Sequence, residues 1–240
     1  MPSTITIEAS FFGFPGIGHG GYTAGLISQH LAGPLEVRFA NPPPLEVALS
    51  LTDRDGTLAL TDGELLIAEA RQVDLDTVIP DPPSLREAEL GMTANLNLPS
   101  HPSPTCMTCG PARAPGKGLR VLVGPVEGRD VVAGTWVPHR NFASDDGTVL
   151  TRFVWAALDC PTHWALRAAY GDQGRVVTAR LAARMIAPIP ADEPAIVMGW
   201  PVAKKGSRFL IGAAAIFSVT GEPLAFSEAT WIRSEATSNS

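Results

Sequence analysis

The chain has 240 residues, of which 45% are hydrophobic and 18% charged, so it can bury a core and disorder is excluded. Its 18 basic and 24 acidic residues give a net charge of −6, which argues against a nucleic-acid partner. No apolar run reaches the roughly 20 residues of a membrane span, and residues 1–4 lack signal-peptide character. Three cysteines make no disulfide framework. We expect a soluble, cytoplasmic globular protein.

The first half predicts one helix followed by short strands. Apolar residues on one side indicate a helix over residues 20–31. Turns containing Pro, Gly or Asp separate the strands expected after it, at residues 36–39, 46–51, 57–60 and 64–71. A proline-rich segment, residues 79–104, is expected to be a linker.

The second half predicts the same order at greater length. A strand is expected at residues 134–137, and then a long apolar helix over residues 150–170, with Gly171 as its stop. Pro161 is expected to break or kink this helix. Four strands follow, at residues 176–186, 195–203, 208–219 and 224–232, and their tight turns indicate an antiparallel meander.

The repeated order predicts two similar units. The sequences of their last strands are also similar: the segment from Gly63 to Ala70 resembles the segment from Gly221 to Ala229. We expect an N-terminal unit at residues 1–78, the linker at 79–104, a C-terminal unit at 105–234 and a flexible tail at 235–240. An apolar helix followed by an antiparallel sheet indicates an α+β fold with each sheet curled around its helix.

This arrangement resembles the hotdog fold of acyl-CoA thioesterases, present twice as a double hotdog. Residues 106–119, which begin Cys106-Met107-Thr108-Cys109-Gly110-Pro111, are similar to the CxxCGPxxPxGL opening of many bacterial hotdog proteins. The turn at Gly221 followed by residues 224–231 is similar to the family's last strand pair. The resemblance covers residues 106–233 well and residues 11–71 weakly.

The family's central helix opens with His-Gly-Gly, and a carboxylate follows nine residues after the histidine. Here His19-Gly20-Gly21 opens the first helix, but Ser28 stands at the acidic position. The second helix has the acid, Asp159, while its opening reads Leu150-Thr151-Arg152. The resemblance therefore implies one composite active site, with Gly20 and Gly21 as oxyanion donors, His19 fixing their loop, and Asp159 as nucleophile or general base. The pairing of residues 151–152 with Ser28 would be a degenerate second site.

Three further residues are candidates for substrate binding. Asn141 stands where the family often has a polar residue, Thr162 could orient the attacking water, and Arg152 could bind a CoA phosphate. Each has a plainer interpretation: a turn residue, a buried hydroxyl bonded to the backbone, and a surface charge. Asp159, which precedes Cys160-Pro161, could likewise be only the N-cap of a new helical segment, and Gly20-Gly21 only a tight turn beside an idle His19.

Two other motifs lead to different chemistry. Residues 16–21 match the dinucleotide fingerprint GxGxxG, but Pro15 and the preceding aromatic residues interrupt the strand that should lead into it. Cys106 and Cys109 have metal-ligand spacing, and the candidates for completing a zinc site are Cys160, His101, His139 and the other, scattered histidines. We expect reduced, buried cysteines and no metal, and leave the zinc alternative open.

The sequence thus predicts hydrolysis of an acyl-CoA or a similar thioester, with CoA entering only as part of the substrate and no separate cofactor. We expect a small-molecule partner, no membrane partner, and a homo-oligomer, namely a dimer of double hotdogs. One alternative is a non-catalytic acyl-CoA-binding or scaffold protein of the same fold. Another is a hydratase that uses Asp145-Asp146 with His139.

Overall fold

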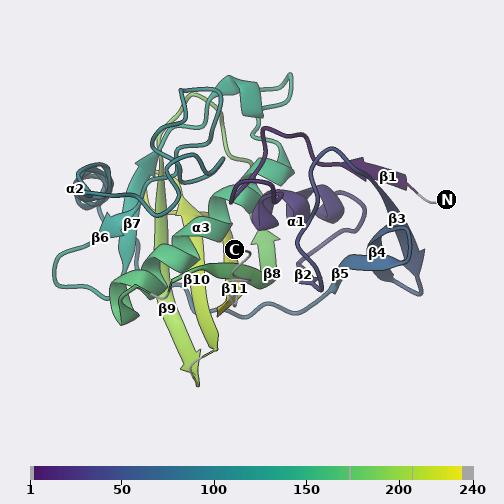
Figure 1. Cartoon of the computed structure of the whole chain (residues 1–240). Helices are drawn as coiled ribbons and strands as arrows, with labels where there is room; N and C mark the ends of the chain where they lie inside the picture. Colours follow the sequence, from purple (N-terminus) through teal and green to yellow (C-terminus); the bar gives the residue numbers. More distant parts are fainter. Residues whose placement is uncertain (1–2, 173, 207, 234–240) are drawn as a thin grey trace.

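One 11-stranded antiparallel sheet organises the part of the chain that the structure describes (Figure 1). The structure is a computed structural model that describes residues 3–172, 174–206 and 208–233. The tail expected at 235–240 lies outside the described residues. The strands are β1 (Ser3–Thr6), β2 (Leu35–Phe39), β3 (Ala48–Arg54), β4 (Thr57–Asp62), β5 (Leu65–Gln72), β6 (Gly124–Pro125), β7 (Val132–Trp136), β8 (Val176–Met185), β9 (Ala195–Lys205), β10 (Phe209–Phe217) and β11 (Pro223–Arg233).

The strand order divides the sheet into two halves built alike. The N-terminal half runs β1-β3-β4-β5-β2, and the C-terminal half runs β8-β11-β10-β9-β7-β6. Read outward from the junction, β2 corresponds to β8, β5 to β11, β4 to β10 and β3 to β9. The two strands with similar sequences, β5 and β11, therefore hold equivalent positions in the two halves of the sheet. The halves join where β2 pairs with β8, from Leu35 opposite Ala183 to Arg38 opposite Arg180.

The predicted meander is wrong for β8. The strands β9, β10 and β11 do form a meander, but β8 pairs with β11 and not with its sequence neighbour β9. The connection between β8 and β9 contains Pro188 and Pro190 and is too long for a tight hairpin. It passes β11 and β10 to reach β9, and β8 pairs with β2 on its other edge.

Two helices pack on one face of this sheet. They are α1 (Gly20–Ser28) and α3 (Thr151–Tyr170), which contact each other, and α3 crosses β9 and β10 (Figure 1). Residues alternate along each strand, so the two faces separate by period two. Val197 and Ile216 join the core under the helices, whereas Met198 and Phe217 join a second cluster on the opposite face.

The expected linker contains a helix, α2 (Leu85–Leu96), which packs against β6 and β7. Ser84 caps it: the Ser84 side chain accepts from the Glu87 N–H, and the Glu87 carboxylate accepts from the Ser84 N–H at 2.7 Å. This Ser-x-x-Glu signal was present in the sequence. Ala88 is buried in the second cluster, so the helix helps to cover the outer face of the C-terminal half of the sheet.

Pro161 does not break α3, so the first of the two expected effects, a break rather than a kink, is wrong. The helix runs through it, and nearly all residues from Phe153 to Leu166 are buried. An interior proline costs about 3 kcal/mol, and burial of this helix between the sheet and α1 offsets that penalty. Asp159 therefore lies in the middle of a helix, and its interpretation as an N-cap is wrong. No helix among the described residues is long and apolar enough to cross a membrane.

Candidate active site

The loop before α1 ends in a histidine that caps the helix. His19 has extended backbone angles (φ −67°, ψ 126°), and its Nδ1 accepts a hydrogen bond from the Tyr22 N–H at 3.3 Å. Backbone bonds hold the loop in place, because Gly18 donates to the Pro43 carbonyl and His19 to the Phe11 carbonyl. The His19 side chain is buried, so the alternative of an exposed, idle histidine is wrong.

Asp159 meets this helix start from the middle of α3. Its Oδ2 accepts a hydrogen bond from the Gly21 N–H at 2.8 Å and lies 3.7 Å from His19 Nδ1. Its Oδ1 accepts a hydrogen bond from Thr178 Oγ1 at 3.0 Å. With 1% of its surface exposed, the carboxyl group is held by these neighbours and not by bulk water. The structure thus brings His19, Gly21 and Asp159 into contact.

Glycine is required for this approach of α1 to α3. A Cβ atom on Gly21 would lie 2.6 Å from Asp159 Cβ and 2.8 Å from the Trp155 carbonyl oxygen. One turn later, a Cβ on Gly25 would lie 2.5 Å from the Cα of Arg152. Both distances are shorter than real contacts allow, so any larger residue would push the helices apart.

Burial and the local charges set the protonation of the site. Burial raises the pKa of Asp159 above its usual 3.8, although His19, the Gly21 N–H and Thr178 act in the opposite direction. Burial by itself lowers the pKa of His19, but Cys106 and Asp159 outweigh it and leave that pKa above 6.5. The site therefore combines a carboxyl that binds its proton unusually well with an imidazole that charges readily.

A cavity of about 470 Å³ opens beside these residues and takes its wall from both halves of the chain. His19, Gly20 and Asp159 line it together with Cys160 and Thr178. Other lining residues are mostly apolar, among them Phe14, Ile17, Phe39, Pro43, Trp164, Val176 and Trp231. Such a mostly apolar wall with a few convergent polar groups is typical of a small-molecule site.

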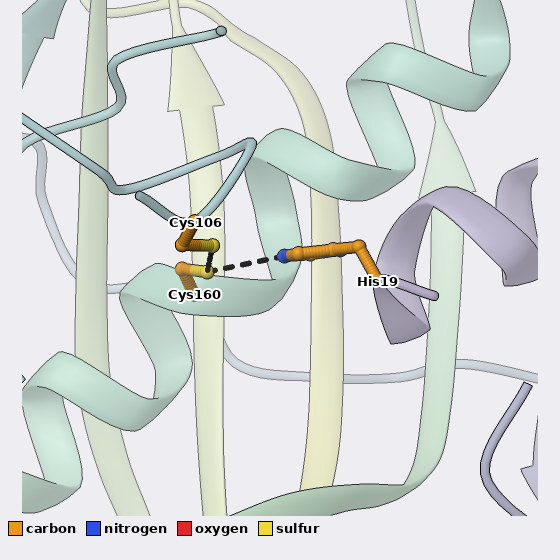
Figure 2. A group of neighbouring side chains, drawn as sticks. All are labelled: His19, Cys106 and Cys160. Carbon is orange, nitrogen blue, oxygen red and sulfur yellow. Dashed lines mark hydrogen bonds between the residues drawn. The ribbon is translucent and has the colours of Figure 1, made fainter. Parts of the chain in front are cut away.

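All three cysteines lie at this wall (Figure 2 shows two of them). His19 Nε2 is 3.3 Å from Cys160 Sγ, which is 3.9 Å from Cys106 Sγ, and the three side chains point toward one another. Contacts with the Cys109 and Cys160 thiols lower the pKa of Cys106 well below its usual 9.0, and the contact with Cys106 raises the pKa of Cys160. Cys106 and Cys109 are buried, as expected.

The three candidates for substrate binding lie elsewhere. Thr162 is fully buried, donates to the Asp159 carbonyl at 2.6 Å and accepts from Trp231 Nε1, which matches its plainer interpretation. Asn141 is exposed and donates to the Gly116 carbonyl. Arg152 is half-buried and stacks on the Phe153 ring, with its backbone against Gly25, one turn before Ser28. None of the three is among the residues that line the cavity.

Sequence reasoning missed several residues that do line the cavity. Thr178 lies on β8, next to a β-bulge opposite Thr230 and Trp231, and only strand pairing brings it to Asp159. Arg167 and Arg175 also line it, and Arg167 pairs with Asp172 at 2.9 Å. His163 packs on the Trp231 ring at 5.0 Å, and its burial lowers its pKa to about 4. No local motif marks Thr178, Arg167 or Arg175, whereas His163 stands one helical turn after Asp159 in the sequence.

The dinucleotide-binding and hydratase alternatives both lack the structural context that they require. The glycines of residues 16–21 lead into a helix, but every pairing of the described strands is antiparallel, whereas a dinucleotide-binding domain needs parallel strands. Asp146 accepts bonds from Ser144 and Thr148 in an exposed turn, and His139 caps a short 3₁₀ helix at Arg140–Phe142. These hydratase candidates are not among the residues that line the cavity.

Solved hotdog structures match the chain over nearly its whole length. A TesB protein of Mycobacterium avium subsp. paratuberculosis is 13% identical with a TM-score of 0.59, covering 98% of this chain and 93% of its own. Acyl-CoA thioesterase II TesB2 from Mycobacterium marinum is 14% identical with a TM-score of 0.58, and the match covers 98% of this chain and 94% of the TesB2 chain. A conserved protein of unknown function with the hot dog fold, from Alicyclobacillus acidocaldarius, is 12% identical with a TM-score of 0.57. This match covers 98% of this chain and 94% of the other.

At these identities the likeness shows the fold. Together with the two equivalent halves of the sheet, it confirms the predicted α+β double hotdog. Neither protein-family models nor curated protein sequences give a match.

Proposed function

We propose that the protein hydrolyses an acyl-CoA or a related acyl thioester in the cavity between its two halves. The observation that carries this proposal is the contact between Asp159 and the start of α1, made at the wall of a mostly apolar cavity. A helix N-terminus stabilises negative charge on a reacting oxygen, and the carboxylate beside it can accept a proton. The names of the similar thioesterases agree with this chemistry.

In the proposed reaction, Asp159 removes a proton from a water molecule whose oxygen attacks the thioester carbonyl carbon. The carbonyl oxygen becomes an oxyanion, which then collapses as the carbon–sulfur bond breaks. The leaving thiolate takes the proton from Asp159, so the products are a carboxylic acid and a free thiol. A thioester is already activated, so this sequence needs no metal and no cofactor.

The contacts divide the roles between the two glycines. The Gly21 N–H already donates to Asp159, so we assign it to orienting the carboxylate. The Gly20 N–H is one of the first-turn donors that helix geometry leaves without a helical partner, and we assign it to the oxyanion. His19 fixes this turn through its cap. Arg167 and Arg175, at the cavity wall, would meet the phosphates of CoA.

The test is hydrolysis of a panel of acyl-CoAs by the wild type and by Asp159→Asn. We expect the wild type to release free thiol from several of them and the variant to lose about 10²–10⁴-fold in kcat/KM, the usual contribution of a general base. The control is Asp145→Asn, an exposed carboxylate in a turn, which should retain the wild-type rate. Full activity in Asp159→Asn would refute the assigned role.

A non-catalytic acyl-CoA-binding protein is the second candidate, and one observation favours it. Asp159 is buried and its pKa is raised, so it holds its proton more tightly than a free carboxylate does. Stabilisation of the protein by acyl-CoAs without release of thiol would identify a binder. A dimer of double hotdogs and a cytoplasmic location remain predictions; sedimentation of the full chain tests the dimer.

A further inference from the structure

We propose that His19, Cys106 and Cys160 bind one zinc-class divalent cation at the wall of the cavity. The inference does not depend on the proposed hydrolysis. It also differs from the sequence-based expectation, which paired Cys106 with Cys109 and assigned no metal. The structure instead gathers one residue from the start of α1, one from the turn after the linker and one from the middle of α3 (Figure 2).

The distances between the ligand atoms fit a tetrahedral ion. Zinc binds thiolate sulfur at about 2.3 Å and imidazole nitrogen at about 2.0–2.1 Å, so tetrahedral neighbours lie roughly 3.5–3.8 Å apart. Here His19 Nε2 and Cys160 Sγ are 3.3 Å apart, the two sulfurs are 3.9 Å apart, and all three atoms lie within 4.8 Å of one another. The two printed distances therefore differ from those of a tetrahedral site by only a few tenths of an ångström.

The donor set selects the kind of ion. Two thiolates and an imidazole are ligands for zinc and similar borderline metals, whereas calcium and magnesium require oxygen. The three side chains are buried, and two thiolates balance the charge of a divalent cation there. The Thr108 N–H, 3.4 Å from Cys106 Sγ, can donate to this thiolate.

Asp159 would orient the His19 ring by accepting a hydrogen bond from the ring nitrogen that does not bind the metal. A metal on Nε2 leaves the imidazole proton on Nδ1, which lies 3.7 Å from Asp159 Oδ2. Histidine ligands commonly donate this second N–H to a carboxylate, which fixes the ring. Without metal, His19 Nδ1 accepts a hydrogen bond from the Tyr22 N–H at 3.3 Å. With metal bound, Nδ1 would carry a proton and donate to Asp159 instead.

The fourth position would face the cavity. His19, Cys106 and Cys160 all line it, so a water molecule or a ligand atom could complete the tetrahedron, as in zinc sites with three protein ligands. The Cys109 thiol contacts Cys106 and Cys160 but does not belong to the group of three atoms. It is therefore the matched control for the two proposed cysteine ligands.

The experiment is anaerobic titration of the reduced full-length protein with cobalt(II) and then zinc. We expect one equivalent of cobalt to give the absorption of a tetrahedral thiolate complex and zinc to displace it. Cys106→Ser and Cys160→Ser should each weaken binding by more than about 100-fold, beyond what loss of a supporting residue causes. Cys109→Ser should retain the stoichiometry and the tetrahedral spectrum.

A measurement on the unaltered protein guards against variants that fail to fold. Zinc is expected to raise the melting temperature and to slow alkylation of Cys106 and Cys160, followed by mass spectrometry. The proposal is overturned if reduced, folded wild type binds neither metal, or if Cys160→Ser binds as tightly as the wild type. Metal binding without thiol release would leave this inference standing while the hydrolase proposal fails.

Discussion

The Gly21 N–H donates a 2.8 Å hydrogen bond to the carboxylate of Asp159, which lies 138 positions further along the chain. The bond joins the first turn of α1 in one half of the double hotdog to the middle of α3 in the other. It unites the glycines and the acid that the sequence distributes between its two units.

Replacing Asp159 by Asn should stabilise the protein at neutral pH. The pKa of Asp159 is higher in the folded chain than the usual 3.8, so its favourable contribution is present at low pH and is lost as the pH rises through the folded value. The amide that replaces the carboxyl group would stay neutral at every pH. We expect the variant to melt above the wild type at pH 8, and the difference to shrink toward pH 5. Asp145→Asn should show no such trend, and an unchanged melting temperature in D159N would contradict the buried-charge argument.

Gly21→Ala should destabilise the fold, because its new methyl group would overlap Asp159 Cβ and the Trp155 carbonyl. Overpacking of this kind costs about 1–3 kcal/mol, measurable by urea unfolding. Gly20→Ala is the comparison, since its nearest contact would be the Thr178 side chain at 3.2 Å and should cost less. Equal losses in the two variants would show that the close approach of α1 and α3 is not limiting.

Thr178→Val should move the acid limb of the pH–rate profile to higher pH. The Thr178 hydroxyl donates to Asp159 Oδ1 at 3.0 Å and so favours the ionised carboxylate. Without it the pKa of Asp159 rises further, and the active form is lost at a higher pH. The comparison is Thr52→Val on β3, which removes a buried hydroxyl that has no hydrogen-bond partner. A shift in both variants, or in neither, would count against the assignment.

Glu36→Gln should weaken the junction between β2 and β8. Glu36 is buried and accepts from Arg38 at 2.6 Å and from Arg180. Burial acts to raise its pKa, but the arginines outweigh this and hold it below the usual 4.5. Its contribution is therefore present above pH 4.5 and is lost as the pH falls through the folded value.

We expect Glu36→Gln to lose about 1.5–3 kcal/mol of unfolding free energy at pH 7, the usual worth of hydrogen bonds to a charged group. The loss should diminish in acid, where the wild type is protonated as well. Glu64→Gln, at an exposed carboxylate in a turn, should change stability little. A loss that persists unchanged in acid would mean that packing, and not charge, explains the effect.

The sequence by itself determined the two helices α1 and α3, most of the strands and the fold class, because apolar periodicity, turn residues and the cysteine-containing motif are local signals. It did not predict α2 or the pairing of β8. It also singled out His19, Gly20, Gly21 and Asp159, since each stands at a position of the family's local motif in one of the two helices. It misjudged Pro161, because the penalty for an interior proline is local while the burial that offsets it comes from distant strands.

Only the tertiary structure decided which residues surround the site. The pairing of β8 with β11 brings Thr178 to Asp159, and the packing of α1 on α3 brings His19 to Cys160. No pattern within one segment records such contacts, because they arise where two separately predicted halves share a sheet and a pair of helices. The grouping of His19 with Cys106 and Cys160, and the cavity beside it, follow from that packing alone.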